Sequence, residues 1–408
     1  MSSIIIAGDT SGSVTLQAPS VAGSTTITLP ATSGTLLQSG TTVTEAQGGT
    51  GTTVGYNGFK NRIINGAIVI DQRNAGASVT PLNAQFTLDR FQSLLTQASK
   101  YSVQQNAGSV TPPAGFTKYL GCTSLSAYSL AAGDFFLQGH YIEGYNIVDL
   151  GWGTANAKTV TLSFWVRSSL TGTFGGSLYN NSGTVSYPYS YTISSANTWE
   201  QKSITIAGPT TGTWESTNST GVAIQFSLGS GTTYSGTAGA WANAFYTSAT
   251  GATSVVGTNG ATFYITGVQL EKGSTATSFD FRSIGTELAL CQRYVIVLGL
   301  PTNNQYVHIG TGSMYNSTAV NLSVALPVSM RATPTVSKTV NGSNEWLQVY
   351  VSSSGVNSNS TPEIGEYLTV GSNILRMYCP GSYSGGTGGQ ASWCQVMNGA
   401  QLVFNAEL

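Results

Sequence analysis

Apolar and polar residues alternate with a period of two along most of the chain. The stretches "TVTLSFWVR" (159–167), "GVAIQFSL" (221–228) and "ATFYITGVQL" (261–270) are clear cases. This period predicts β-strands that bury one face. Similar runs lie between residues 59 and 282, separated by Gly, Asn and Ser turns at the spacing of a sandwich or barrel, with no long helical pattern among them. The sequence therefore predicts an all-β fold with a central jelly-roll β-sandwich of two packed sheets.

Residues 1–58 predict a separate, extended β arm. "SVTLQAP" (13–19) and "TTITLPATSGTLL" (25–37) have the alternation of short strands. Such strands bury too little apolar surface to be stable alone. We therefore expect them to be completed by symmetry-related copies of the same segment or by a docking platform on a larger assembly. The glycines of "TEAQGGTGTT" (44–53) predict a turn or pivot after the arm, and a disordered tail is the alternative.

A rise in charge marks the end of the sandwich. The stretch "EKGSTATSFDFRSIGTELALCQRY" (271–294) is rich in charged residues, whereas the hundred or so residues before it have very few. Within it, Ile284, Leu288, Cys291 and Val295 recur at helical spacing, which predicts a short amphipathic helix between two domains. Further short strands follow. We predict an arm and joint at 1–58, a sandwich at 59–283 and a smaller β-domain at 284–408.

The composition is unusually low in charge. Asp, Glu, Lys and Arg make up 8% of the chain and the formal net charge is −1, against about 25% charged residues in typical soluble domains. Such a surface has no electrostatic footprint for nucleic acid or anionic lipid, so we expect neither as a partner. The beginning of the chain has no cationic segment and the apolar runs are short, so we expect no secretion signal and no membrane insertion.

The four cysteines are widely spaced and do not form a disulfide or zinc pattern. Buried thiols are the default interpretation, although Cys379 and Cys394 could pair in an oxidising medium.

The residues that could support catalysis are few. The chain has two histidines, His140 and His308, and neither lies in a metal-ligand spacing or near a recognisable nucleophile pattern. Glycoside hydrolysis needs two carboxylates, and the candidates are the group Asp134, Glu143 and Asp149 and the pair Glu363 and Glu366. Solvation of loops and strand edges explains both groups more simply. We expect no enzymatic activity, no catalytic residue and no cofactor.

Binding of a neutral sugar is easier to support from the sequence. Aromatic rings stack on the C–H faces of sugars, while amide, hydroxyl and guanidinium groups bond the sugar hydroxyls. Trp165, Arg167 and Gln225 lie on the polar sides of their strands and would form a platform if those sides line one concave sheet. Contact with a neighbouring subunit or loop is the alternative, because interfaces also favour Trp and Arg.

Two further aromatic groups are candidates. "SYPYSYTI" (186–193) places three tyrosines on one face of a strand that its proline marks as an edge strand, so the rings form either a binding strip or the lid of a core. Other large rings lie in Gly/Ser/Thr-rich loops. The complete candidate glycan-binding set is Trp165, Arg167, Gln225, Tyr187, Tyr189, Tyr191, Trp214, Tyr234 and Trp241.

Three stretches carry a resemblance to phage proteins. "GDTSGSVTLQAPSVAGSTTITLPATSGTLL" (8–37) with "EAQGGTGTT" (45–53) resembles the N-terminal arm of tailed-bacteriophage tail fibres and related appendages. "NRIINGAIVIDQRNAG" (61–76) and "FYITGVQLEKGSTATSFDFRSIGTELALCQRY" (263–294) resemble the opening and closing of the β-sandwich in the same class of virion proteins. The resemblance implies a homotrimer that docks to other tail proteins through its N-terminal arm and presents β-domains to the host surface.

The sandwich also resembles jelly-roll carbohydrate-binding modules, through "TLSFWVRS" and "FYITGVQLE". In those modules the last strand commonly carries acidic residues that help to hold a structural calcium. Here the corresponding positions are Thr266 and Gly267, so we expect no metal at that place.

These observations lead to one functional expectation and two alternatives. We expect a non-enzymatic tail fibre or adhesin of the virion tail, assembled in the host cytoplasm, that binds host surface polysaccharide. One alternative is a purely architectural virion protein, such as a capsid-decorating or tail-collar component. The other is a polysaccharide depolymerase.

Overall fold

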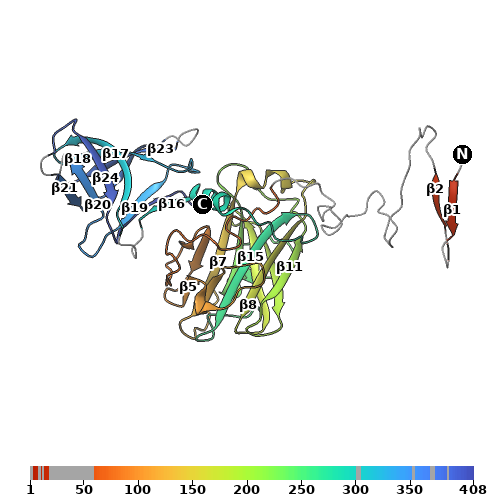
Figure 1. Cartoon of the computed structure of the whole chain (residues 1–408). Helices are drawn as coiled ribbons and strands as arrows, with labels where there is room; N and C mark the ends of the chain where they lie inside the picture. The colour runs from red at the N-terminus through yellow and green to blue at the C-terminus, as the bar shows by residue number, and fades with distance from the viewer. Residues whose placement is uncertain are drawn as a thin grey trace. The chain divides into compact units, whose positions relative to one another are not determined.

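The structure, a computed structural model, describes residues 3–7, 11, 13–17, 59–299, 305–351, 354–367, 373–383 and 386–408 (Figure 1). The chain separates into two units, Met1–Tyr56 and Asn57–Leu408. In the first unit, β1 (Ser3–Ala7) pairs antiparallel with β2 (Ser13–Gln17). The strand predicted at the start of 13–19 is therefore present. The strand predicted within 25–37 and the glycine joint at 44–53 lie outside the described residues.

The second unit begins with the predicted β-sandwich, in which two antiparallel sheets pack face to face (Figure 1). The six-stranded sheet has the order β10-β9-β12-β7-β4-β3, with β3 (Gln85–Leu88), β4 (Phe91–Leu95), β7 (Phe135–Glu143), β9 (Gly172–Asn180), β10 (Ser186–Ile193) and β12 (Thr220–Ser230). The five-stranded sheet has the order β11-β8-β15-β6-β5, with β5 (Tyr101–Gln105), β6 (Leu120–Ser124), β8 (Val160–Ser168), β11 (Glu200–Ile206) and β15 (Thr262–Lys272).

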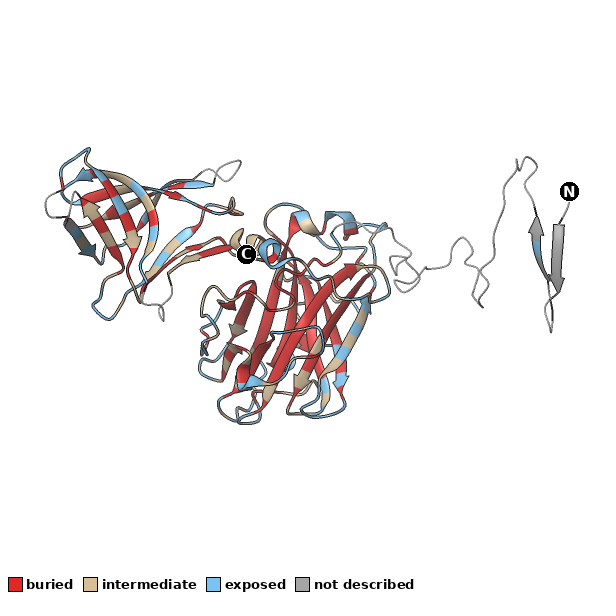
Figure 2. Cartoon of the chain, viewed as in Figure 1, coloured by how far each residue is buried: buried red, intermediate tan, exposed pale blue. Residues whose placement is uncertain are grey.

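The alternation along each strand decides which side chains form the sandwich core. Leu162, Phe164 and Val166 of β8 and Ile224 and Phe226 of β12 are fully buried between the sheets. The rings of Phe164 and Phe226 meet edge to face with centroids 5.0 Å apart. Figure 2 shows that the sandwich strands are largely buried, whereas the connecting loops are exposed. The all-β sandwich predicted from the period of two is thus confirmed.

Short elements complete the sandwich. Four 3-10 turns occur in its loops, η2 (Ala107–Ser109), η3 (Gly144–Asn146), η4 (Val148–Leu150) and η5 (Thr232–Tyr234). The segment after η5 contributes β13 (Ser235–Gly236) and β14 (Ser248–Ala249), which pair in parallel.

The C-terminal β-domain has its own buried core. Its three-stranded sheet has the order β16-β25-β19, with β16 (Val295–Leu298), β19 (Thr335–Thr339) and β25 (Gln401–Asn405). Its seven-stranded sheet has the order β21-β20-β24-β17-β18-β23-β22, with β17 (Val307–Asn316), β18 (Ala319–Ala325), β20 (Leu347–Val351), β21 (Ser354–Ser358), β22 (Glu363–Tyr367), β23 (Ile374–Pro380) and β24 (Ala391–Val396).

The helix predicted from Ile284 onward is α1 (Ile284–Gln292), which leads from β15 to β16. The Ser283 side chain caps its first turn by accepting a hydrogen bond from the Thr286 N–H. Val295, which also fits the helical spacing, lies in β16 instead. No helix in the described parts of the chain is long and apolar enough to cross a bilayer.

Charged side chains hold the C-terminal domain against the sandwich. The Glu407 carboxylate pairs with Arg90 and, at 2.9 Å, with Arg73 of the sandwich. Two arginines that follow the sandwich in the chain also contact it: Arg293 pairs with Glu143 at 2.7 Å, and Arg331 donates to the Asn218 backbone carbonyl. These contacts form a junction between the two β-domains, and Arg293, near the end of the charge-rich segment, takes part in it.

Candidate functional site

The structure does not bring together the platform expected from Trp165, Arg167 and Gln225. Trp165 and Arg167 lie in β8 of the five-stranded sheet, whereas Gln225 lies in β12 of the six-stranded sheet. All three point away from the shared core, so they occupy opposite outer faces of the sandwich. The prediction of a common platform is wrong because alternation within a strand fixes its faces but not the sheet to which it belongs.

The outer face of the five-stranded sheet nevertheless carries a ring cluster beside Arg167. The rings of Tyr119 and Tyr264 are 5.1 Å apart, and Trp199 packs edge to face against Tyr119 at 5.5 Å. The Arg167 guanidinium lies 5.6 Å from the centre of the Tyr264 ring, and its Nε donates to the Asn197 carbonyl. This arginine is thus already engaged by its own domain.

The three tyrosines of β10 form part of the core. The strand is at the edge of its sheet, as its proline predicts, but Tyr187, Tyr189 and Tyr191 are all buried. The Tyr191 ring packs edge to face on Phe164 of the opposite sheet at 5.0 Å. The binding strip is therefore excluded by the direction of the rings, and the alternative of a core lid is confirmed.

Trp214 and Trp241 form a cluster with Trp152, and their centroids are 4.8 to 5.7 Å apart. Both are partly buried and pack against the sandwich core. Their indole N–H groups donate to the backbone carbonyls of Thr211 and Ala207. These rings therefore pack in an apolar environment, which the Gly/Ser/Thr-rich sequence around them does not indicate.

Tyr234 belongs to a continuous set of aromatic contacts on the outer face of the six-stranded sheet, which we name the aromatic arc. The ring centroids of Phe86 and Tyr141 are 6.4 Å apart. Further along, the centroid separations are 5.0 Å from Tyr179 to Phe245, 5.8 Å from Phe245 to Tyr234 and 5.1 Å from Tyr234 to Phe135. Tyr141 and Tyr179 meet through their hydroxyls, which are 3.5 Å apart. In this order the arc consists of Phe86, Tyr141, Tyr179, Phe245, Tyr234 and Phe135.

Gln225 lies inside the arc and orients its tyrosine hydroxyls. Its Nε2 donates to the hydroxyl of Tyr179 at 2.9 Å and to that of Tyr141 at 3.4 Å. The amide lies directly over Gly139, where a Cβ would come within 2.4 Å of Gln225 Oε1. Gln225 is fully buried, so it is a positioning residue beneath the tyrosines and not a surface donor.

The electrostatics of the arc suit a neutral ligand. Burial raises the pKa of Tyr141, and the hydrogen bonds from Tyr179 and Gln225 only partly oppose this effect. Burial likewise raises the pKa of Tyr179 well above its usual value. Both hydroxyls therefore stay protonated near neutral pH and can exchange hydrogen bonds with other hydroxyl groups.

Sequence reasoning found Gln225 and Tyr234 but missed the other arc residues. Tyr141 and Phe135 stand on β7 at alternate positions around Gly139, and Tyr179 stands on β9. A period-two analysis of "FFLQGHYIE" places Phe135 and Tyr141 on the same face of the strand as Gly139, but Gln138 and His140 lie on the opposite face, so the pattern does not tell which face is outward. Phe245 comes from an irregular segment and has no such signal.

The candidate catalytic carboxylates are each held by their own partners. Asp134 accepts hydrogen bonds from Thr96, Tyr128 and the Ala131 N–H, and although burial opposes them, these bonds lower its pKa. Glu143 is bound by Arg293 and Tyr294, and Asp149 by Arg62 and Lys272. Glu363 lies exposed on β22, and the Glu366 side chain is outside the described residues.

The histidines have different environments. His140 is buried, and its Nε2 lies 3.0 Å from the Ile64 carbonyl, where burial lowers its pKa well below the usual value. His308 lies exposed on β17. All four cysteines are free and buried, so the default interpretation of buried thiols is confirmed.

The place corresponding to the calcium site of carbohydrate-binding modules is occupied by hydrogen bonds within the chain. The Thr266 hydroxyl lies 2.7 Å from the Lys118 carbonyl and 3.4 Å from the Ala67 carbonyl, and Gly267 has φ +62° beside Phe116. Among the described residues, no three His, Cys, Asp or Glu side chains gather where they could hold a metal ion.

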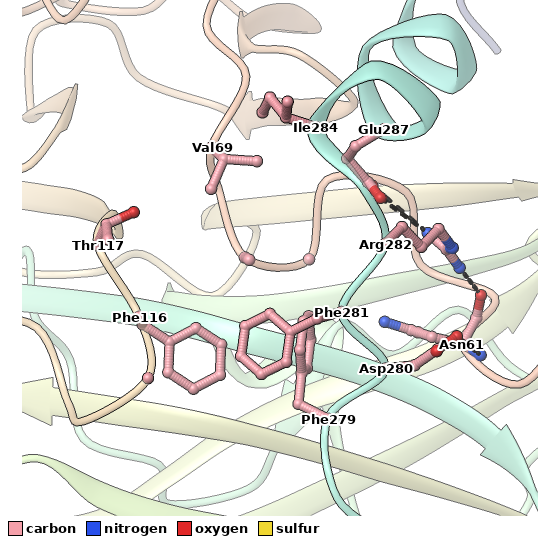
Figure 3. A pocket seen from close by; sticks show the side chains of 13 residues that line it. Asn61, Val69, Phe116, Thr117, Phe279, Asp280, Phe281, Arg282, Ile284 and Glu287 are labelled. Carbon is pink, nitrogen blue, oxygen red and sulfur yellow. Dashed lines mark hydrogen bonds and ion pairs between the residues drawn. The ribbon is translucent and has the colours of Figure 1, made fainter.

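A pocket of about 260 Å³ lies near the start of the sandwich (Figure 3). The rings of Phe116, Phe279 and Phe281 meet on one side of it, with centroids 4.7 to 5.3 Å apart. On the other side, Arg282 bonds to Glu287 and to the Asn61 carbonyl. Because the Arg282 side chain is engaged in these contacts, the pocket offers mainly apolar surface and contains none of the predicted site residues.

Comparisons with known proteins identify distant structural neighbours of part of the chain. No family model and no curated protein matches the sequence. One similar solved structure is the enzymatically active domain of tailspike protein 4 from bacteriophage CBA120, with 12% identity and a TM-score of 0.30 over 52% of this chain and 21% of that one. Another is a family 11 carbohydrate-binding module from Clostridium thermocellum in complex with a β-1,3-1,4-mixed-linked tetrasaccharide, with 12% identity and a TM-score of 0.25 over 50% of this chain and 100% of that one.

A sugar-binding protein from Bacteroides thetaiotaomicron, described as putative, has 10% identity and a TM-score of 0.30 over 52% of this chain and all of that one. At these TM-scores the likeness carries no argument about function, which rests on the geometry of the arc.

Proposed function

We propose that this chain is a non-enzymatic structural protein of a tailed-bacteriophage virion, a tail fibre or adhesin, that binds neutral glycan of the host surface. The observation that carries the glycan part is the aromatic arc, in which six rings join in sequence on one sheet face and the buried amide of Gln225 orients two of their hydroxyls. Rings supply flat surface for sugar C–H groups, and the hydroxyl of the half-buried Tyr141, which Gln225 and Tyr179 orient, supplies a polar contact.

The charge distribution supports a neutral polyhydroxyl ligand over an ionic one. The contacts within the arc are made by phenyl, phenol and amide groups. The two arginines at the arc are both paired with Glu407: Arg73 lies 5.4 Å from the Phe86 ring, and Arg90 donates to the Tyr141 backbone carbonyl. A polyanion would need unpaired Lys or Arg on this face to release its counterions.

The virion part rests on the resemblance of the N-terminal segments to tail-fibre arms. A two-stranded hairpin such as β1–β2 is marginal in water by itself, which supports completion by other chains. We therefore propose a homotrimer whose arm docks to other tail proteins and whose localisation is the virion tail after assembly in the host cytoplasm.

The binding role is favoured over a depolymerase by the state of the carboxylates. Asp134, Glu143 and Asp149 each satisfy a separate structural contact. Burial raises the pKa of Asp149, but its contacts with Arg62 and Lys272 outweigh this and lower the pKa below its usual value. A glycosidase acid needs a raised pKa and a second carboxylate across the scissile bond.

A glycan array followed by calorimetry tests the binding part. Tyr234→Ala removes a half-buried ring from the arc, and Tyr141→Phe removes one oriented hydroxyl while keeping the ring. We expect each to weaken glycan binding by about tenfold, the effect of losing a well-placed contact. The matched control is Tyr145→Ala, which removes a tyrosine that is 62% exposed on η3, outside the arc.

The glycan proposal fails if the wild-type chain binds no glycan, or if both arc variants bind as tightly as the wild type. Immunogold labelling of intact particles and light scattering of the purified chain test the virion part. A label away from the tail, or a stable monomer, would contradict it.

A further inference from the structure

The seven-stranded sheet of the C-terminal domain buries one face and leaves the other in solvent. In Figure 2 buried and exposed positions alternate along its strands, and Figure 1 shows β20, β24, β17 and β18 side by side. Val349, Cys394 and Leu322 point into the domain core. Residues at the alternate positions form what we name the solvent face, on which the side chains are mostly aromatic, amide or hydroxyl.

A stacked aromatic pair stands on this face. Tyr350 of β20 and Trp393 of β24 are direct cross-strand partners, and their rings are parallel within 1° with centroids 4.0 Å apart. The Tyr350 ring lies close over Gly355 of β21, which a Cβ would crowd at 3.0 Å. Trp393 remains 38% exposed, and His308 of β17 lies 6.0 Å from it. Tyr350 therefore packs on the sheet, and Trp393 stacks on Tyr350 while part of its own ring stays exposed to solvent.

A row of amides lies next to the stacked pair. In register across three strands, Gln395 donates to Gln348 at 2.6 Å, and Gln348 donates to Asn357 at 2.9 Å. The Asn357 side chain in turn donates to Glu345. Each of these amides has two donor hydrogens and uses one of them in the row, so donors at fixed positions remain for a ligand.

A second aromatic pair lies on the same face beyond a strip of hydroxyls. Tyr315 of β17 and Tyr378 of β23 meet edge to face at 6.2 Å, and Tyr315 is 64% exposed. Along β17, Thr311, which is registered with Trp393, and Ser313 lie between Trp393 and Tyr315. Across the sheet, the row that starts at Trp393 passes through Thr311 and Ser323 and ends at Arg376 of β23, which is exposed. The face therefore presents rings at two places with small hydroxyl side chains between them.

We propose that the solvent face of the seven-stranded sheet is a second glycan-binding site, which takes an extended neutral oligosaccharide. One sugar stacks on Trp393, the amides of Gln395 and Gln348 bond its hydroxyls, and the chain runs along β17 past Thr311 and Ser313 toward Tyr315. The inference rests on the proposed function only for the class of ligand, because its residues are separate from the aromatic arc.

The chemistry of the face distinguishes a sugar from a protein partner. Protein interfaces place their aromatic anchors in a central, apolar, fully desolvated patch with a polar rim. Here the centre is formed by hydroxyl side chains and the rings lie to either side, with an aligned amide row beside one of them. A linear polyhydroxyl ligand meets rings and hydrogen-bonding groups alternately, as this face presents them.

The full chain is tested against an array of neutral oligosaccharides of glucose, galactose, mannose and N-acetylhexosamines, followed by calorimetry with the best neutral ligand. We expect Trp393→Ala to weaken binding at this site by about tenfold and to lower the ligand stoichiometry, while Trp393→Phe retains most of it because the stack on Tyr350 is kept. Tyr306→Ala is the control, since that tyrosine is 46% exposed just before β17.

The arms of the experiment separate this site from the arc. Loss of affinity in Trp393→Ala but not in Tyr141→Phe supports the second site whatever happens to the first. Loss only in Tyr141→Phe leaves the proposed function standing and overturns this inference. It is also overturned if no neutral oligosaccharide binds in a Trp393-dependent way, or if Trp393→Ala abolishes binding to a protein of the host envelope while leaving oligosaccharide binding unchanged.

Discussion

Replacement of Glu407 by alanine should destabilise the protein far more than removal of an ordinary surface charge. The Glu407 side chain is 3% exposed and pairs with Arg90, whose side chain is 0% exposed, and with Arg73. Arg90 also lies 3.5 Å from the centre of the Tyr294 ring. Glu407→Ala would leave a fully buried guanidinium without its counter-charge, which typically costs about 3–5 kcal/mol of unfolding free energy.

Chemical denaturation in guanidinium chloride, followed by tryptophan fluorescence and circular dichroism, measures this effect. Glu363→Ala in the same domain removes an exposed carboxylate and should change the unfolding free energy by less than about 0.5 kcal/mol. The double variant Arg90→Met with Glu407→Leu should be more stable than either single variant, because a buried ion pair can be replaced by apolar side chains at little cost.

Glu407→Ala should also affect the aromatic arc. The Arg90 guanidinium donates to the Tyr141 backbone carbonyl, and Arg73 lies over the Phe86 ring, so both partners of Glu407 touch the aromatic arc. We therefore expect Glu407→Ala to weaken glycan binding at the arc as well as stability. The reasoning is refuted if Glu407→Ala costs less than about 1 kcal/mol, the range of a solvated pair, or if the double variant is less stable than both singles.

Two further predictions concern groups buried in the cores. The cysteines should not react with Ellman's reagent in the native state but should react after unfolding, because burial raises the pKa of Cys394 to about 12 and also raises that of Cys379; rapid native labelling, or a Cys379–Cys394 disulfide found by mass spectrometry, would contradict this. Burial raises the pKa of Asp89 to about 6, against the attraction of Arg73 and hydrogen bonds from Gln72. Its folded state therefore binds the proton more tightly than the unfolded state, so the stability due to Asp89 is full below pH 4 and is lost as pH rises through 6. Subtracting the pH–stability curve of Asp89→Asn from that of the wild type should isolate this decline, and a rise over the same range would contradict it.

Local pattern was enough to predict the strands and which side of each strand is buried. The alternation in 159–167 and 221–228 places Phe164 and Phe226 inside, and both are fully buried. It was not enough to say which strands are neighbours, because pairing depends on contacts distant in sequence. That is why Trp165 and Gln225 were expected on one face and lie on two.

The aromatic sites were hard to predict for the same reason. The arc joins rings from β3, β7, β9 and the segment around η5, so no single window of sequence contains it. Trp393 did have a local signal, since "ASWCQV" (391–396) alternates so that Cys394 and Val396 face inward. Its stacking partner Tyr350 is on another strand, and only the register of β20 with β24 brings the two rings together.

The positions of the few charged residues explain what the low charge of the chain means for binding. The arginines with the most extensive contacts pair inside the protein or across the junction, where they hold carboxylates or backbone carbonyls. These residues are Arg62, Arg73, Arg90, Arg282, Arg293 and Arg331. Charge committed to such contacts adds little to the surface field, so rings, amides and hydroxyls make up much of the outer sheet faces, beside a few charged residues such as Arg376. Faces of that kind gain little from ionic partners and can still bind a neutral polyhydroxyl chain, because stacking and hydrogen bonding do not depend on net charge. High salt should therefore leave glycan binding nearly unchanged, whereas an ionic ligand would be released.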